Sequence, residues 1–168
     1  MAFIFAYTLD GDADVTIKDM PLDTTANYGT GGLHKGDLVI TNAGLLRKAG
    51  AATPSGTSVG VLEASEFTGL IAQGQPYAAT NSSFIASAVD TTRYPNGMGK
   101  VRLDKTAVVY RVGVKSGQTL TNANLQASYG ISVDANGDQT LDTTNTTATL
   151  AKVIDFSKDG KTAFVTLT

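Results

Sequence analysis

The chain of 168 residues contains no cysteine and no tryptophan, and its single histidine is His34. The absence of cysteine excludes a disulfide scaffold, thiolate metal sites and a cysteine nucleophile. A serine nucleophile needs a base, but His34 lies in a glycine-rich segment and no Gly-x-Ser-x-Gly motif accompanies it. Glu63 and Glu66 lie three apart and could in principle form an acid/base pair, but this spacing is more typical of a solvated loop. We therefore expect that the protein is not an enzyme.

Charged residues are also scarce, at 17% of the chain, and the formal net charge is −2. No basic cluster is present, so the electrostatic footprint of a nucleic-acid-binding protein is missing. No apolar run approaches the roughly 20 residues that cross a bilayer, and the N-terminus lacks the basic residues of a signal peptide. We expect neither nucleic acid nor a membrane as partner, and a protein that stays in the cytoplasm where it is made.

Threonine, serine, asparagine and glycine are abundant instead, and these residues favour strands and tight turns. Short apolar runs with period-two alternation predict strands, and a chain of this length predicts one domain spanning residues 1–168. The runs are 3–7, 38–41, 45–48, 59–62, 101–103, 106–115, 131–133, 150–156 and 162–167. The predicted fold is all-β, built from hairpins as a sandwich or a small barrel, with very little helix.

Local signals place several turns and faces. Asn136-Gly137 and Asp159-Gly160 each separate two apolar runs and are the most convincing hairpin turns. Several of the other turn signals should also mark hairpins; these are Asp10-Gly11, Ala43-Gly44, Ser55-Gly56, Asn96-Gly97 and Ser116-Gly117. The best helical candidate is a single turn capped by Thr121 and running to Gln126, with Gly130 stopping it.

The strand over 106–115 is predicted to bury Val108, Tyr110, Val112 and Val114 and to expose Arg111 and Lys115. In the first strand, Phe3, Phe5 and Tyr7 are predicted to share one face, with Ile4 and Ala6 on the other.

Two segments do not fit a regular strand pattern. Residues 1–35 include a sparse, Asp-punctuated stretch and are predicted to form an extended arm. Residues 73–100 are predicted to form a long interface loop, since long loops are usually functional. The aromatic residues at candidate interfaces are Phe3, Phe5, Tyr77, Phe84 and Tyr94.

Four oxygen-bearing residues have the spacing of part of a calcium-binding loop: Asp134, Asn136, Asp138 and Asp142. The sixth position, where an EF-hand needs glycine, is Gln139, and the twelfth, where it needs glutamate, is Asn145. The hairpin turn explains Asn136-Gly137 without a metal. Alternating Asp10, Asp12 and Asp14 are likewise more typical of a protected strand edge than of an ion site. We predict no cofactor, and calcium is the only metal for which the sequence offers a weak candidate.

Two stretches carry a resemblance to a known family. Lys35-Gly-Asp-Leu-Val-Ile-Thr-Asn-Ala-Gly-Leu-Leu, leading to Val59-Gly-Val-Leu-Glu63, and Ala127-Ser-Tyr-Gly-Ile-Ser-Val133 resemble segments of the head decoration (cement) proteins of tailed bacteriophages. The resemblance implies a β-rich virion subunit, often a homotrimer, on the outer capsid surface. It implies that the partner is the major capsid protein, clamped near local three-fold axes of the expanded shell.

An alternative from another class stays open at this point. A virion appendage that binds a host receptor or a carbohydrate would also be β-rich and have no active site. Sugars usually stack on large aromatic faces, and only 7% of this chain is aromatic. A concave aromatic cluster would favour this alternative.

Overall fold

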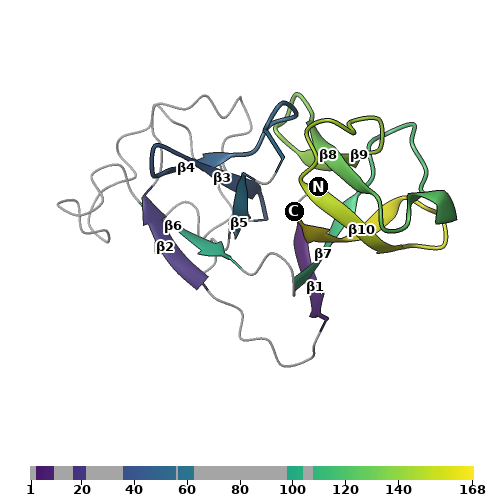
Figure 1. The fold of residues 1–168 in the computed structure, drawn as a ribbon, viewed down its shortest axis with the longest axis horizontal. Helices are drawn as coiled ribbons and strands as arrows, with labels where there is room; N and C mark the ends of the chain where they lie inside the picture. The colour runs from purple at the N-terminus through teal and green to yellow at the C-terminus, as the bar shows by residue number, and fades with distance from the viewer. Residues whose placement is uncertain (1–2, 10–16, 22–35, 56, 63–97, 104–107) are drawn as a thin grey trace.

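The computed structural model describes residues 3–9, 17–21, 36–55, 57–62, 98–103 and 108–168. Within these ranges the chain forms eleven strands and one short 3-10 helix, Asn122–Asn124. The strands make two antiparallel sheets that pack together (Figure 1). The prediction of an all-β protein with very little helix is confirmed. In the described ranges, no helix is long and apolar enough to cross a membrane.

The larger sheet has six strands and curls back on itself. Its order is β1 (Ile4–Thr8), β7 (Val108–Gly113), β11 (Thr162–Leu167), β10 (Ala151–Phe156), β8 (Ser128–Val133) and β9 (Gln139–Asp142). Beyond the end of β7, Val114 forms a parallel bridge with Leu141, and the Lys115 N–H donates to the Leu141 carbonyl at 2.9 Å. The last strand, β9, therefore meets the chain that leaves β7. Strand β1 remains outside this closure as an edge.

The smaller sheet has five strands. Its order is β2 (Ile17–Pro21), β6 (Met98–Arg102), β5 (Ser58–Leu62), β3 (Leu38–Asn42) and β4 (Leu45–Lys48). The two outer strands, β2 and β4, approach each other. The fold thus combines two packed sheets, as in a sandwich, with strong curling within each sheet.

One hydrophobic core joins the two sheets. Leu38 and Val61 of the smaller sheet belong to the same buried cluster as the inner residues of the larger sheet, among them Tyr110, Ile131 and Val165. The neighbours of Leu38 and Val61 along their strands, Val39 and Leu62, are also buried. Since both faces of β3 and β5 are covered, these strands have nearly continuous apolar sequences instead of strict alternation.

The side chain of Gln139 bridges the sheets inside this core. The Leu38 N–H donates to its Oε1 at 2.6 Å, and its Nε2 donates to the carbonyl oxygens of Leu38 at 3.1 Å and Ala49 at 2.8 Å. The carboxamide thereby acts as a short piece of strand, because it offers a donor and an acceptor to the backbone of β3. It is completely buried and fully hydrogen-bonded.

The hairpins predicted at Asn136-Gly137 and Asp159-Gly160 are confirmed, and the turn signal at Ala43-Gly44 also forms a hairpin. The turns contain residues of positive φ: Ala43 (50°) and Gly44 (81°), Gly137 (84°), and Gly160 (65°). Positive φ at both central residues of the Ala43-Gly44 turn is the signature of a type I′ hairpin. In β7, Val108, Tyr110 and Val112 are buried and Arg111 is exposed, as predicted. Val109, on the face of Arg111, is also buried, and Val114 and Lys115 are half-buried, so the predicted contrast between the two faces is only partly present.

The predicted helical turn is present but shorter. It begins after Thr121, whose backbone N–H donates to the Asn124 side-chain oxygen at 2.8 Å, and it ends at Asn124. Gln126 follows with φ of 65°, so the chain leaves the helical region there. Gly130 lies within β8. The prediction that Gly130 stops the helix is therefore wrong, because the helix has already ended at Asn124.

The predicted arm and loop are described only in part. Within residues 1–35, β1 pairs with β7 and β2 pairs with β6, so these two runs are edge strands of the two sheets and not free chain. Residues 10–16, 22–35 and 73–97 lie outside the described residues. Residues 98–100, at the end of the predicted loop, belong to β6.

Candidate interaction surface

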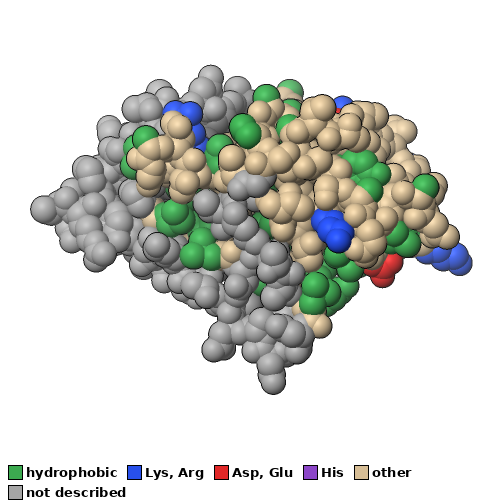
Figure 2. Space-filling view, in the orientation of Figure 1, with side chains coloured by type: hydrophobic (Ala, Val, Ile, Leu, Met, Phe, Trp, Pro, Cys, Tyr) green, Lys and Arg blue, Asp and Glu red, His purple; other side chains and the backbone are tan. Residues whose placement is uncertain are grey.

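Strand β1 and the residue after it expose a cluster of large apolar side chains. The exposed fractions are 46% for Ile4, 41% for Phe5, 42% for Tyr7 and 54% for Leu9. In the described part of the chain, Leu125 is the one other large apolar residue that is this exposed. Figure 2 shows hydrophobic side chains gathered at the lower rim of the molecule, where Figure 1 places β1. We call Ile4, Phe5, Tyr7 and Leu9 the β1 patch.

A β-bulge explains why the strand exposes apolar residues on both faces. The register between β1 and β7 shifts between Phe5 and Tyr7. Ile4 lies opposite Arg111 and Tyr7 opposite Val109, and these two β7 residues share a face because they are two apart. Phe5 lies opposite Tyr110, on the other face. The predicted face of Phe3, Phe5 and Tyr7 is therefore wrong for Tyr7, since a bulge inserts one residue and reverses the alternation.

Two aromatic contacts fix the patch on the sheet. The rings of Tyr7 and Phe164 lie 6.5 Å apart with an interplanar angle of 35°. The Arg102 guanidinium of β6 lies 4.8 Å from the centre of the Phe5 ring, within range of a cation–π contact. The patch thus contacts the larger sheet through Tyr7 and the smaller sheet through Phe5.

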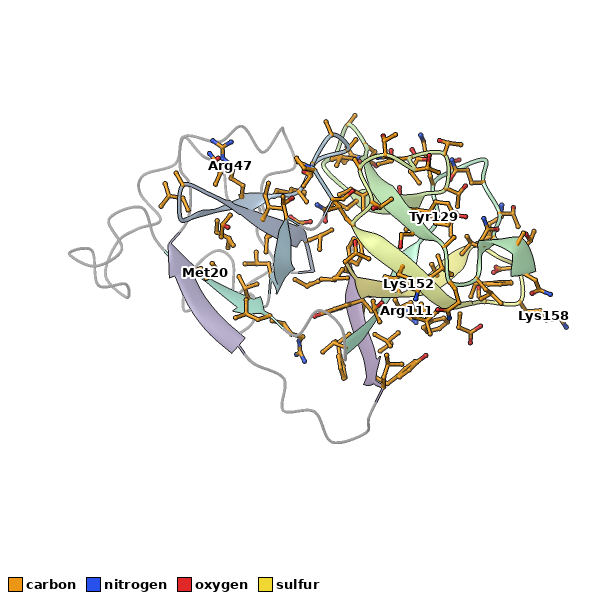
Figure 3. All side chains as sticks on the ribbon, in the orientation of Figure 1. Met20, Arg47, Arg111, Tyr129, Lys152 and Lys158 are labelled. Atoms are coloured by element: carbon orange, nitrogen blue, oxygen red, sulfur yellow. The ribbon has the colours of Figure 1, made fainter. Side chains whose placement is uncertain are left out.

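The described charged groups nearest the patch are Arg102 and Arg111, and Asp155 lies two strands beyond Arg111 in the same cross-strand row. Arg111 is exposed next to Ile4, and Figure 3 shows Arg111 and Lys152 in the same region of the sheet. Residues 3–9 carry no charge. Within the described residues, the patch is therefore apolar with two arginines as its nearest charges, although the formal charge of the whole chain is negative.

The candidate interface residues fall into three groups. Phe3 is only 1% exposed and belongs to the core, so the structure removes it from any interface. Phe5 belongs to the β1 patch. Tyr77, Phe84 and Tyr94 lie outside the described residues, as do His34, Glu63, Glu66, Asp10, Asp12 and Asp14.

The four calcium candidates do not form one site. Asp134 Oδ1 accepts hydrogen bonds from the backbone N–H groups of Asn136 at 2.9 Å and Asp138 at 2.8 Å, so this carboxylate closes the β8–β9 turn. Asp142 lies four residues along the strand from Asp138, or roughly 13 Å for extended chain. In the described ranges, no group of three or more His, Cys, Asp or Glu side chains is placed to hold a metal ion.

Asp142 instead has a structural role that the sequence analysis missed. Its carboxylate accepts hydrogen bonds from Lys115 Nζ at 2.6 Å, Gln118 Nε2 at 2.8 Å and Thr144 Oγ1 at 2.6 Å. Burial alone would raise the pKa of Asp142, but these hydrogen bonds outweigh it and hold the pKa well below its ordinary value. The contacts connect the end of β9 to the chain that follows β7.

Comparison with known proteins adds no family assignment. A scan against protein-family models and a search of curated proteins found no match for this chain.

Proposed function

We propose that the chain is a capsid decoration protein that binds the outer surface of a phage head and stabilises the expanded shell. The observation that carries this proposal is the β1 patch, four large apolar side chains exposed on and just after an edge strand. Contiguous exposed apolar side chains of this kind mark protein–protein contacts.

The family resemblance agrees with this proposal at the level of the scaffold. The first resembling stretch forms the β3–β4 hairpin and the adjacent β5, and the second forms most of β8. These strands carry core residues such as Leu38, Val61 and Ile131. The β1 patch lies outside the resembling stretches, so the surface evidence and the resemblance are independent of each other.

The size of the patch suits a subunit that acts in many copies. If a large side chain carries roughly 200 Å² of surface, the exposed fractions amount to about 350 Å², against about 800 Å² per partner in a stable complex. Such a contact is weak alone. It becomes strong when an oligomer engages several equivalent sites on a lattice, because the later contacts form at high effective concentration. We therefore also propose that the chain forms a homotrimer and that its partner is the major capsid protein.

Co-sedimentation with expanded heads that lack the protein tests the proposal, with the mass of the free chain measured by light scattering. We expect saturable binding in a number set by the lattice, by a trimer. A monomeric chain that binds no form of the head would overturn the proposal, and screening against glycans and host-cell receptors would then test the alternative of a host-binding appendage.

A further inference from the structure

We infer that the open edge of β1 takes up an additional strand: an extended, apolar segment of the major capsid protein that bears a carboxylate for Arg111. This inference rests on the proposed function and specifies how the partner is held. In such strand addition, backbone hydrogen bonds supply affinity and side-chain contacts supply specificity.

The sheet order leaves this edge open. β1 pairs with β7 on one side, and no strand in the described ranges pairs with its other side. At the opposite end of the same sheet, β9 meets the chain after β7, and in the smaller sheet β2 and β4 approach each other. An unpaired strand edge presents backbone donors and acceptors that can bind another extended chain.

The edge strand is short and bulged, which partly protects it against such pairing, but two other usual protections are missing. Native edge strands are commonly blocked by charged side chains or proline, and residues 3–9 contain neither. The bulge at this strand sends Ile4 and Tyr7 to one face and Phe5 to the other. An incoming strand would therefore find apolar side chains on both faces, which favours a segment that is apolar on both of its own faces near the contact.

The charge beside the edge indicates the chemistry of the occupant. Arg111 is exposed one strand away from the open edge, and within the part of the chain that the structure describes its guanidinium forms no ion pair. Asp155 lies in the same cross-strand row but beyond Phe164, about 10 Å from Arg111 by strand spacing. A carboxylate on the incoming segment would give Arg111 a partner, and arginine–carboxylate pairs are strong and directional.

A second copy of the chain fits the edge less well. A head-to-tail trimer joined by strand addition would have to pair β1 with an outer strand of the smaller sheet, and within the described ranges those strands, β2 and β4, approach each other. A two-fold pairing of β1 with itself would leave both Arg111 side chains without a carboxylate, since residues 3–9 carry none. The roughly 350 Å² of the patch is also less than half of what a stable dimer usually buries per partner.

The test uses single lysine substitutions in the full-length chain. Ile4→Lys and Tyr7→Lys place a charge on the edge strand, and Leu125→Lys is the matched control, because Leu125 is exposed but lies after the 3-10 turn. We expect the two β1 variants to keep the wild-type solution mass and to bind expanded heads at least about tenfold more weakly, while the control binds like wild type. Arg111→Glu is expected to weaken binding as well.

Hydrogen exchange of the wild-type chain gives a second readout that does not depend on any variant folding. Backbone amides of residues 4–8 that exchange rapidly in the free protein are expected to become protected on the heads. Unchanged exchange there, or β1 variants that fold and bind normally, would overturn the inference while leaving the proposed function standing. A β1 variant with a lower solution mass than wild type would show that a second copy occupies the edge. If the wild-type chain does not bind heads at all, the proposed function itself fails.

Discussion

At the scale of single residues, Gln139 shows how one buried polar side chain can join two sheets. Its sequence position gave one usable signal: Gln139 and Leu141 are two apart in a strand and must share a face, so a buried Leu141 implies a core-facing Gln139. The identity of its partners, Leu38 and Ala49, could not be predicted, because they lie about a hundred residues away in the chain.

Replacing Gln139 should therefore be costly. Gln139→Leu removes the acceptor of the buried Leu38 N–H, and we expect the free energy of unfolding to fall by about 2–4 kcal/mol. Gln139→Glu keeps that acceptor but turns a carboxylate toward two carbonyl oxygens, so it should be destabilising at neutral pH and less so in acid. Urea unfolding measures both effects. Thr140→Ala, at the adjacent half-buried position, is the control and should change stability by less than about 1 kcal/mol.

Asp142 should make the stability of the fold depend on pH. Its pKa is lower in the folded state than in the unfolded chain, so it contributes stability above pH of about 4, and this contribution is lost as the pH falls through the folded pKa. We expect Asp142→Asn to lose about 1–2 kcal/mol at pH 7 and to show a smaller further loss between pH 5 and pH 2 than wild type.

Lys115→Met tests the cause of this effect, because it removes the cation at 2.6 Å from Asp142. It should also reduce the pH dependence, and the double variant should differ little from Asp142→Asn. Equal acid sensitivity of all four proteins, measured by thermal unfolding, would show that the Asp142 contacts do not contribute to it.

At the scale of the strand, the sequence predicts the elements better than it predicts their faces. The hairpins at Gly44, Gly137 and Gly160 follow from local turn chemistry, so they were predictable. The bulge in β1 depends on how this strand pairs with β7, which is far away in sequence. The face on which Tyr7 lies could therefore not be predicted from the sequence. The 3-10 helix likewise ends at Asn124, before the predicted Gln126, and Gln126 has a positive φ that its residue type does not favour.

Phe3, directly before β1, and Phe5, within it, offer a matched pair. Phe3 is buried in the core, so Phe3→Ala should lower the free energy of unfolding by about 3–5 kcal/mol. Phe5 is 41% exposed and contacts Arg102, so Phe5→Ala should cost less than about 1.5 kcal/mol but weaken binding to expanded heads. Urea unfolding and co-sedimentation distinguish the two. Equal losses of stability would contradict the assignment of Phe5 to the surface.

At the scale of the whole molecule, the shared core predicts how the two sheets unfold. Leu38 and Val61 come from the smaller sheet and pack in the same cluster as Val108, Ile131 and Val165 of the larger one. Since neither sheet can expose these residues without opening the common core, we expect one cooperative transition, with the calorimetric and van't Hoff enthalpies equal. Differential scanning calorimetry of the wild-type chain measures both.

The shared core also predicts what happens when the hydrogen bonds of Gln139 between the two sheets are removed. Gln139→Leu breaks the side-chain bonds to β3 but leaves the apolar contacts of Leu38 in place, so the single transition should persist at a lower temperature. Leu38→Ala removes apolar contact between the sheets and should broaden or split the transition. Two transitions in the wild-type chain would mean that the sheets are stable independently, and the core contacts between them would then contribute little to folding.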